Sequence, residues 1–370
     1  MDNVKQINCF MYCNSMISLF MLMQEAYLPT IAMETRMNDT RVNEQDFLQA
    51  ALELDKEKIA IYVVQGGDIR TKDDNGANIL HHLSSAHLQK DASRRSEQLK
   101  ILRYILDCKS SPDINSVTVN GRTPLLVATT QDNVPLMKLL IEKGANVNAA
   151  KVDGTVPLHE AALGSHLGVE TLIAKGANID SVMKNGETPL HWAAGSRHTD
   201  ALDNLKLLIE KGANVNAACT AGITPLHCAA AVGNQKAVEL LIKKGATVKA
   251  AMKDGTTALH SAARMGFKGC IDAMILLVEA GAALDSKNAE GKTPLDILES
   301  KLKESPEELK KVKEELKQAV RNRIEMSKTE ENRAACFRAL ALLGVGSSEQ
   351  NSDHGLYSIG RCPDKGEKSY

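Results

Sequence analysis

The sequence has few aromatic residues and no excess of charge of either sign. Phenylalanine, tryptophan and tyrosine make up 3% of its 370 residues, and 45 lysines and arginines nearly balance 46 aspartates and glutamates. Nucleic acids attract basic proteins, and single strands stack their bases on aromatic side chains. Because both features are missing here, we expect no nucleic-acid partner.

The eight cysteines are scattered, without a C-x-x-C pair or a dense framework. Such spacing is expected of thiols that are kept reduced in a cytosol, and it indicates neither a zinc site nor a disulfide scaffold. We therefore expect a cytoplasmic protein with no metal and no cofactor. Cys219 and Cys228 are interpreted as small buried hydrophobic residues.

A short pattern built around a glycine recurs along the chain. Its copies include "KVDGTVPLHEAAL" at 151–163, "MKNGETPLHWAAG" at 183–195 and "CTAGITPLHCAAA" at 219–231. The key glycines of all the copies are Gly76, Gly121, Gly154, Gly186, Gly222, Gly255 and Gly291. A second glycine, replaced once by Ser111, precedes each key glycine at a constant distance. One half of the unit thus keeps a fixed register, and the insertions fall in the other half, as expected for a surface loop.

Each copy predicts two helices followed by a projecting turn. Thr188 can cap a first helix with its hydroxyl, and Pro189 suits the first helical position. Residues 202–214 predict a second helix that ends at Gly212, a residue suited to a left-handed helix end. Asn-Gly and Asp-Gly dipeptides then favour a tight turn before the next unit. A capping unit over 47–69 completes the array.

The T-P-L-H-x-A core and the repeat length of about 33 residues resemble the ankyrin repeat family. The resemblance covers residues 43–304 and implies an all-α solenoid of about eight helix-turn-helix units with projecting β-turns. It also implies that the Thr and His of each core form hydrogen bonds that lock neighbouring units together. We therefore interpret the core histidines as structural, and not as catalytic or metal-binding residues. These histidines are His159, His191, His227 and His260.

The two ends of the chain differ from the repeats. Residues 1–42 form a leader whose uncharged run at 7–23 resembles a weak secretory segment, a short membrane anchor or a helix packed on the repeats. Residues 305–345 predict capping helices, of which the first has Ser305 and Glu308 as a capping box and carries an apolar stripe. The polar residues 346–370 are predicted to be disordered.

The resemblance implies a partner protein bound on the concave face, through the turn tips and the ends of the first helices. The residues that vary there mix apolar and charged side chains, as protein-binding surfaces do; a solvated face with scattered hydrophobic residues is the alternative. The candidate partner-binding residues are Val152, Thr155, Leu163, Lys184, Glu187, Trp192, Thr220, Ile223, Val232, Lys253, Thr256, Arg264 and Met265. Trp192 fits an interface hot spot and a packing residue equally well.

A longer insertion at 84–99 brings Lys90, Arg94 and Arg95 close together in the sequence. We interpret this segment as a solvated loop, and an ionic contact with an acidic partner is the alternative.

The sequence as a whole predicts a non-enzymatic, monomeric scaffold or adaptor that binds another protein. A first alternative is a membrane-tethered or secreted adaptor that uses residues 7–23. Short polar tails also resemble those of ankyrin-rich effectors that intracellular bacteria export into host cells. A second alternative is the substrate-docking arm of a modifying enzyme. Outside the repeats we find no nucleophile elbow, phosphate loop or metal motif, so we predict no catalytic residues.

Overall fold

The computed structural model describes residues 41–86, 92–108, 110–327 and 329–345. In this part of the chain all regular structure is helical, with isolated bridges in place of strands. The predicted all-α class is confirmed. The uncharged run at 7–23 and the polar tail at 346–370 lie outside the described residues. The chain divides into two units, one ending at Ala221 and the other beginning at Gly222, and each is described by itself.

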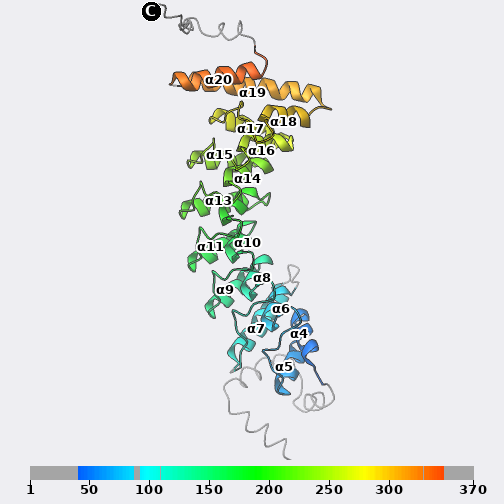
Figure 1. Ribbon diagram of the computed structural model, residues 1–370. Helices are drawn as coiled ribbons and strands as arrows, with labels where there is room; N and C mark the ends of the chain where they lie inside the picture. Colours follow the sequence, from blue (N-terminus) through cyan, green and yellow to red (C-terminus); the bar gives the residue numbers. More distant parts are fainter. Residues whose placement is uncertain (1–40, 87–91, 109, 328, 346–370) are drawn as a thin grey trace, which may run out of the picture. The chain divides into compact units, whose positions relative to one another are not determined.

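The first unit consists of successive pairs of helices (Figure 1). The pairs are α4 (Glu44–Glu53) with α5 (Lys56–Val64), α6 (Ile79–Ser85) with α7 (Ala92–Asp107), α8 (Pro124–Thr130) with α9 (Val134–Glu142), α10 (Pro157–Ala162) with α11 (His166–Ala174), and α12 (Pro189–Gly195) with α13 (Ala201–Glu210). The first helices of the pairs pack side by side in one layer. From α7 onward the second helices do the same in another layer.

The second unit repeats this arrangement and ends in two longer helices. Its pairs are α14 (Pro225–Val232) with α15 (Gln235–Lys243), α16 (Ala258–Met265) with α17 (Lys268–Glu279), and α18 (Pro294–Lys301) with α19 (Pro306–Met326), followed by α20 (Glu330–Leu342). With the pairs of the first unit, these make eight helix pairs in the described residues, and the sequence predicts about eight units. The second helix of the last pair, α19, is one that the sequence predicts as a cap outside the array. Val312, Leu316 and Val320 of α19 are buried, and α19 packs on α17, as expected of a capping helix.

The predicted capping box at the start of α19 is wrong. Ser305 occupies the N-cap position, but its side chain makes no capping hydrogen bond. The helix instead begins with Pro306, which has no N–H to satisfy, followed by Glu307 and Glu308. These two carboxylates interact favourably with the positive end of the helix dipole.

The interpretation of residues 84–99 as a solvated loop is also wrong for the part that the structure describes. Arg94 and Arg95 lie in α7, which is 16 residues long, whereas α9 and α11 each have 9 residues. Much of the insertion therefore lengthens a second helix. The guanidinium of Arg94 donates to the backbone carbonyl of Glu53 at 3.3 Å. Lys90 lies outside the described residues.

The Thr and His of the repeat core bond to each other at the start of the first helix. In α12, Nδ1 of His191 lies 2.9 Å from Oγ1 of Thr188 and accepts the Thr188 backbone N–H at 3.1 Å. Thr188 thus occupies the N-cap position as predicted, and it forms a capping box in which His191 is the third helical residue. In α8, where Leu126 replaces the His, Oγ1 of Thr123 accepts the Leu126 N–H directly at 3.2 Å.

In four other buried histidines the second ring nitrogen, Nε2, reaches the next repeat, and we call this contact the imidazole bridge. Nε2 of His81, His159, His227 and His260 lies 2.9, 3.2, 3.3 and 3.2 Å from the carbonyl oxygens of Arg122, Glu187, Thr256 and Lys292, respectively. A carbonyl oxygen only accepts, so Nε2 carries the proton. Since Nδ1 accepts an N–H, the imidazole is neutral. The predicted locking role is confirmed for these contacts, and His81, without the full core sequence, shares it.

A backbone ladder joins the projecting turns of the first unit. The Gly154 N–H donates to the Lys151 carbonyl at 2.9 Å, which closes one turn. The Val152 N–H then donates to the Asn120 carbonyl of the preceding turn at 3.2 Å, and the Lys184 N–H donates to Asp153 at 2.9 Å. Each turn is therefore tied to its neighbours through the main chain, independently of side-chain identity.

Replacing Gly154 by alanine should destabilise the fold more than replacing Gly176. Both glycines have a positive φ, 88° and 86° respectively, and alanine costs about 1 kcal/mol or more there. A Cβ atom at Gly154 would also lie 2.9 Å from the Lys184 nitrogen, whereas one at Gly176 would meet nothing within 4 Å. This crowding should add about 1–3 kcal/mol to the loss. Urea denaturation of Gly154→Ala and Gly176→Ala measures the difference, and equal losses would contradict the close approach of the turns.

Candidate functional site

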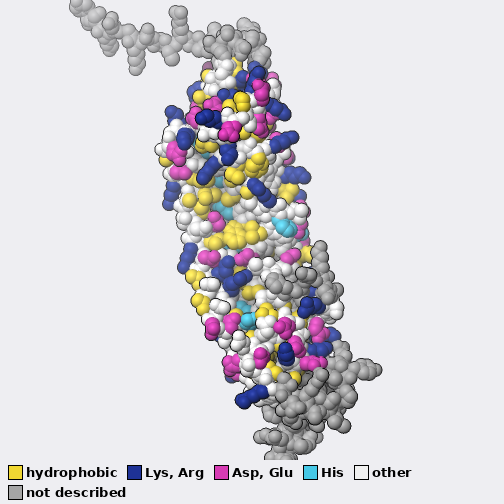
Figure 2. All heavy atoms as spheres, turned by 90° about the vertical axis from the view of Figure 1, so that its right-hand side faces the viewer, with side chains coloured by type: hydrophobic (Ala, Val, Ile, Leu, Met, Phe, Trp, Pro, Cys, Tyr) yellow, Lys and Arg dark blue, Asp and Glu magenta, His cyan; other side chains and the backbone are white. Residues whose placement is uncertain are grey.

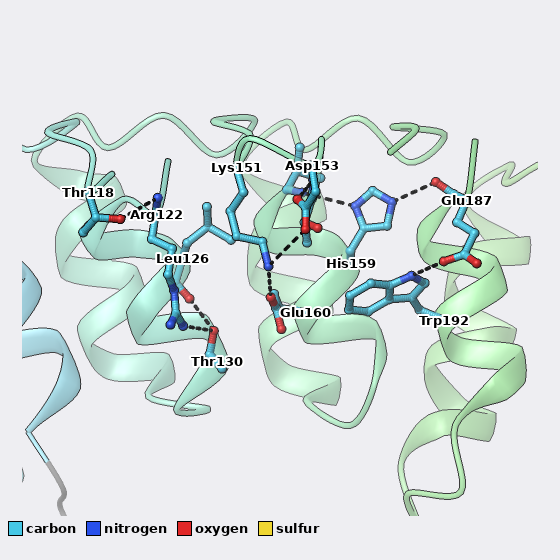
Figure 3. Close-up of polar contacts among 12 residues, drawn as sticks. Thr118, Arg122, Leu126, Thr130, Lys151, Asp153, His159, Glu160, Glu187 and Trp192 are labelled. Carbon is cyan, nitrogen blue, oxygen red and sulfur yellow. Dashed lines mark hydrogen bonds and ion pairs between the residues drawn. The ribbon is translucent and has the colours of Figure 1, made fainter. Parts of the chain in front are cut away.

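An open groove of about 670 Å³ lies along the turns and first helices of the first unit. Its lining residues are Asn120, Arg122, Lys151, Val152, Asp153, Glu160 and Lys184. Figure 3 shows the side chains of Arg122, Lys151 and Glu160 beside one another, below the turns from which the first two arise. The candidates Val152 and Lys184 are both in the groove, but most of its charged lining was not predicted.

The middle of the groove holds a three-membered charge cluster. The Lys151 ammonium lies 3.0 Å from Oε1 of Glu160 and 3.8 Å from Oδ2 of Asp153. The Lys151 and Glu160 side chains are only 19% and 13% exposed, so water screens this pair incompletely. Burial opposes ionisation of Asp153, but hydrogen bonds from Thr155 and the Lys151 charge outweigh it and lower the pKa of that carboxyl group. Asp153 is therefore ionised at neutral pH.

Arg122 is held at both its backbone and its side chain. Its carbonyl oxygen accepts the imidazole bridge from His81 at 2.9 Å. Its guanidinium donates to Oγ1 of Thr130 at 3.3 Å, and the Thr130 hydroxyl in turn donates to the Leu126 carbonyl at 2.8 Å (Figure 3). The charge thus lies against the end of α8 at one end of the groove.

Trp192 and Glu187, both predicted as partner-binding residues, contact each other. The indole Nε1 donates to Oε2 of Glu187 at 3.0 Å. The indole ring also forms a T-shaped pair with the His159 imidazole, with 5.6 Å between ring centroids and 69° between planes. Because His159 bonds to the Glu187 carbonyl, these three residues connect α10 to α12 (Figure 3). Trp192 packs within the unit and still keeps a partly exposed ring.

The other candidates of the first unit differ in exposure. Leu163 and Thr220 are exposed, in agreement with the prediction. Thr155 is fully buried, so its prediction as a surface residue is wrong. Arg122 and Glu187 also follow a key glycine, but they are only half-buried because their long side chains extend outward. The shorter side chain of Thr155 remains inside. Cys219, interpreted as a buried residue, is buried.

The second unit presents a smaller set of exposed candidates. Lys253, Arg264 and Met265 are exposed; Ile223, Val232, Thr256 and Cys228 are half-buried. Phe267 was missed, although its side chain is 39% exposed and it follows Met265 closely. An aromatic residue in the short connection between two helices is the sequence signal that could have identified it. On the side of the first helices, Figure 2 shows hydrophobic side chains lying among charged ones.

Arg122 could have been found with the rule that found Glu187 and Ile223. All three directly follow a key glycine, at a position that varies between repeats. Lys151 and Glu160 are harder to recognise, because their pairing depends on how a turn and the following helix place two flexible side chains. Within the described residues, no three His, Cys, Asp or Glu side chains are grouped as a metal site requires. No helix of this part of the chain is long and apolar enough to cross a membrane.

Comparison with known families identifies the repeats. Residues 90–183 and 164–252 each match a model described as ankyrin repeats in three copies, and residues 254–289 match a single ankyrin repeat. Together these matches cover more than half of the chain.

Individual relatives share shorter stretches. An ankyrin repeat protein of Monkeypox virus is 44% identical over 52 residues, which are 14% of this chain and 9% of the viral protein. One from Variola virus is 28% identical over 142 residues, 30% of this chain and 25% of that protein. The chain thus spans at most a quarter of these viral relatives. The Notch-regulated ankyrin repeat-containing protein of Xenopus tropicalis is 41% identical over 89 residues, 22% of this chain and 76% of that protein.

The buried imidazoles predict that acid destabilises the fold. Burial lowers the pKa of His81 to about 4 and also lowers the pKa values of His159 and His260, whereas an unfolded histidine titrates near about 6.5. Between these values the unfolded chain binds more protons than the folded chain. The free energy of unfolding should therefore be constant above about pH 7 and decrease as the pH falls through about 6.5 toward 4.

Urea denaturation between pH 7.5 and 5.5 measures this slope in a range where most carboxylates stay ionised. The variant His81→Asn should be less stable than the wild type at pH 7.5 and should lose less stability on acidification. Stability that rises between pH 7 and 5.5 would contradict neutral, buried imidazoles.

Proposed function

Because the chain belongs to the ankyrin repeat family, whose repeats are in general protein–protein interaction modules, we propose that it is a non-enzymatic module that binds another protein. The binding surface is the concave face expected of this family, formed by the turns and first helices of the repeats. The observation that carries the proposal is that variable apolar side chains stand exposed on a hydrogen-bonded main chain. Val152 is 60% exposed and Met265 44% exposed, and each lies close to charged residues.

The main chain beneath this surface is organised before a partner arrives. The ladder fixes the turn of Val152 to its neighbours, and the imidazole bridges fix the backbones of Arg122 and Glu187. A partner therefore does not have to order these segments, which lowers the entropy cost of association. The partly exposed Trp192 ring is oriented by Glu187 and offers apolar area of the kind found at interface hot spots.

A second candidate function, a membrane-tethered or exported adaptor, is favoured only by the uncharged sequence at 7–23. It remains a prediction, as do the cytoplasmic location and the monomeric state. The proposed contact surface is the same in both cases.

Substitution of exposed apolar residues on this surface should abolish partner binding without unfolding the protein. We expect the double variant Val152→Glu and Met265→Glu to capture at least about tenfold less partner than the wild type. Each substitution places a charge in a contact that binding would desolvate. The measurement is quantitative affinity capture with full-length protein, together with thermal unfolding of each variant.

The matched control is Leu167→Glu combined with Leu342→Glu. Both leucines are exposed and belong to α11 and α20, not to a turn or a first helix. The control should retain the partners of the wild type. Equal retention by both double variants, at unchanged thermal stability, would exclude the proposed surface.

A further inference from the structure

We propose that the groove of the first unit binds acidic side chains of an extended peptide segment in the partner protein. The inference rests on the proposed function and adds the chemistry of one part of the recognised segment. It is carried by the charges of the groove, by the contacts that occupy some of them, and by the spacing of the turns.

The groove has one more positive than negative charge, and its charges are unevenly engaged. Both lining carboxylates, Asp153 and Glu160, lie within 4 Å of the Lys151 ammonium. The other two cations, Arg122 and Lys184, lie outside this cluster. Thr130 takes one hydrogen bond from the Arg122 guanidinium, which has five N–H donors in all, and Lys184 is exposed. A ligand with separated carboxylates can satisfy these two cations and avoid the cluster.

The backbone ladder sets the order of these charges along the groove. The Val152 N–H bonds to Asn120 in the turn of Arg122, and the Lys184 N–H bonds to Asp153. The groove thus runs over three successive turns, with Arg122 in the first, the Lys151 cluster in the second and Lys184 in the third. Exposed Val152 offers an apolar contact between the two outer cations.

An extended peptide fits this spacing. Packed helices are separated by about 10 Å, so successive turns repeat at about that distance. An extended chain rises about 3.3 Å per residue, so every third residue meets an equivalent place on the next turn. Acidic residues six positions apart would therefore meet Arg122 and Lys184, and the residue midway between them would face the Lys151 cluster. A nucleic-acid backbone is a poorer ligand, because its unbroken run of phosphates would also face Asp153 and Glu160.

The test measures binding of two fluorescent nonapeptide libraries to the full-length protein. One library has Glu at positions 2 and 8 with uncharged residues elsewhere, and the other has Gln at the same two positions. We expect the Glu library to bind at least about tenfold more tightly, with an affinity that falls as salt is raised. The double variant Arg122→Gln and Lys184→Gln should reduce the preference for the Glu library over the Gln library by at least about tenfold.

Two further variants separate a specific site from general attraction. Lys175→Gln combined with Lys211→Gln removes the same charge from exposed positions at the ends of α11 and α13, and it should leave binding unchanged. Glu160→Gln releases Lys151 from its ion pair, so it should bind the Glu library more tightly than the wild type. Lys184→Gln alone, at an exposed position, should lose part of the preference even if Arg122→Gln proves unstable.

The proposal is overturned if the two libraries bind equally, if Arg122→Gln with Lys184→Gln binds like the wild type, or if a single-stranded oligonucleotide of the same length binds more tightly than the Glu library. Partner capture that remains sensitive to Val152→Glu and Met265→Glu while the libraries bind equally would overturn the acidic-peptide site alone. The proposed function fails separately, when that capture is insensitive to both substitutions.

Discussion

The hydrogen bond from a buried, neutral imidazole to the backbone of the next repeat is the constraint on which the rest of the fold depends. At His260, Nδ1 accepts the N–H of Thr257 at the start of its own helix, and Nε2 donates to the carbonyl of Lys292 in the following repeat. One planar ring thus sets both where a helix begins and where the next turn lies. Making both contacts at once requires the neutral ring, because a doubly protonated imidazole could still donate to Lys292 but could not accept the Thr257 N–H.

This constraint links the fold to the candidate surface. The carbonyl groups that accept the bridges belong to residues directly after a key glycine, such as Arg122 and Glu187. The main-chain carbonyl of such a residue accepts the hydrogen bond that joins two repeats, while its side chain can differ from repeat to repeat. Binding residues can therefore change without loosening the turns that present them. The key glycine before such a residue permits neighbouring turns to approach closely. At Gly154, for example, a Cβ atom would lie 2.9 Å from the backbone nitrogen of Lys184 in the next turn.

The parts of this arrangement that recur in the sequence could be predicted from it. A fixed spacing between glycines predicts the helix pairs, and recurring Thr and His residues predict a shared structural role. The bridge of His81 was not predicted, because Asn78 takes the place of the threonine there and the core is incomplete. The length of α7 was missed because charged, polar residues such as Arg94 and Arg95 fit a loop as well as an exposed helix.

The candidate site was less predictable than the fold, for a physical reason. Periodicity places Val152 and Lys184 near a turn, but it does not decide whether a short side chain such as Thr155 emerges into solvent. Nor does it show that Lys151 is engaged by Glu160, since that depends on the rotamers of two long side chains from different elements. Charge in a groove becomes informative only when such internal pairs are known.

Nitrogen-15 NMR of the histidine side chains tests the imidazole bridge most directly. The bridge predicts that His81, His159, His227 and His260 all carry their proton on Nε2, that Nδ1 is unprotonated, and that His81 in particular stays neutral well below pH 6. Couplings across the hydrogen bonds to the acceptor carbonyls should be detectable. Rings protonated on Nδ1, or doubly protonated near pH 6.5, would contradict the bridge and the positioning of the turns that depends on it.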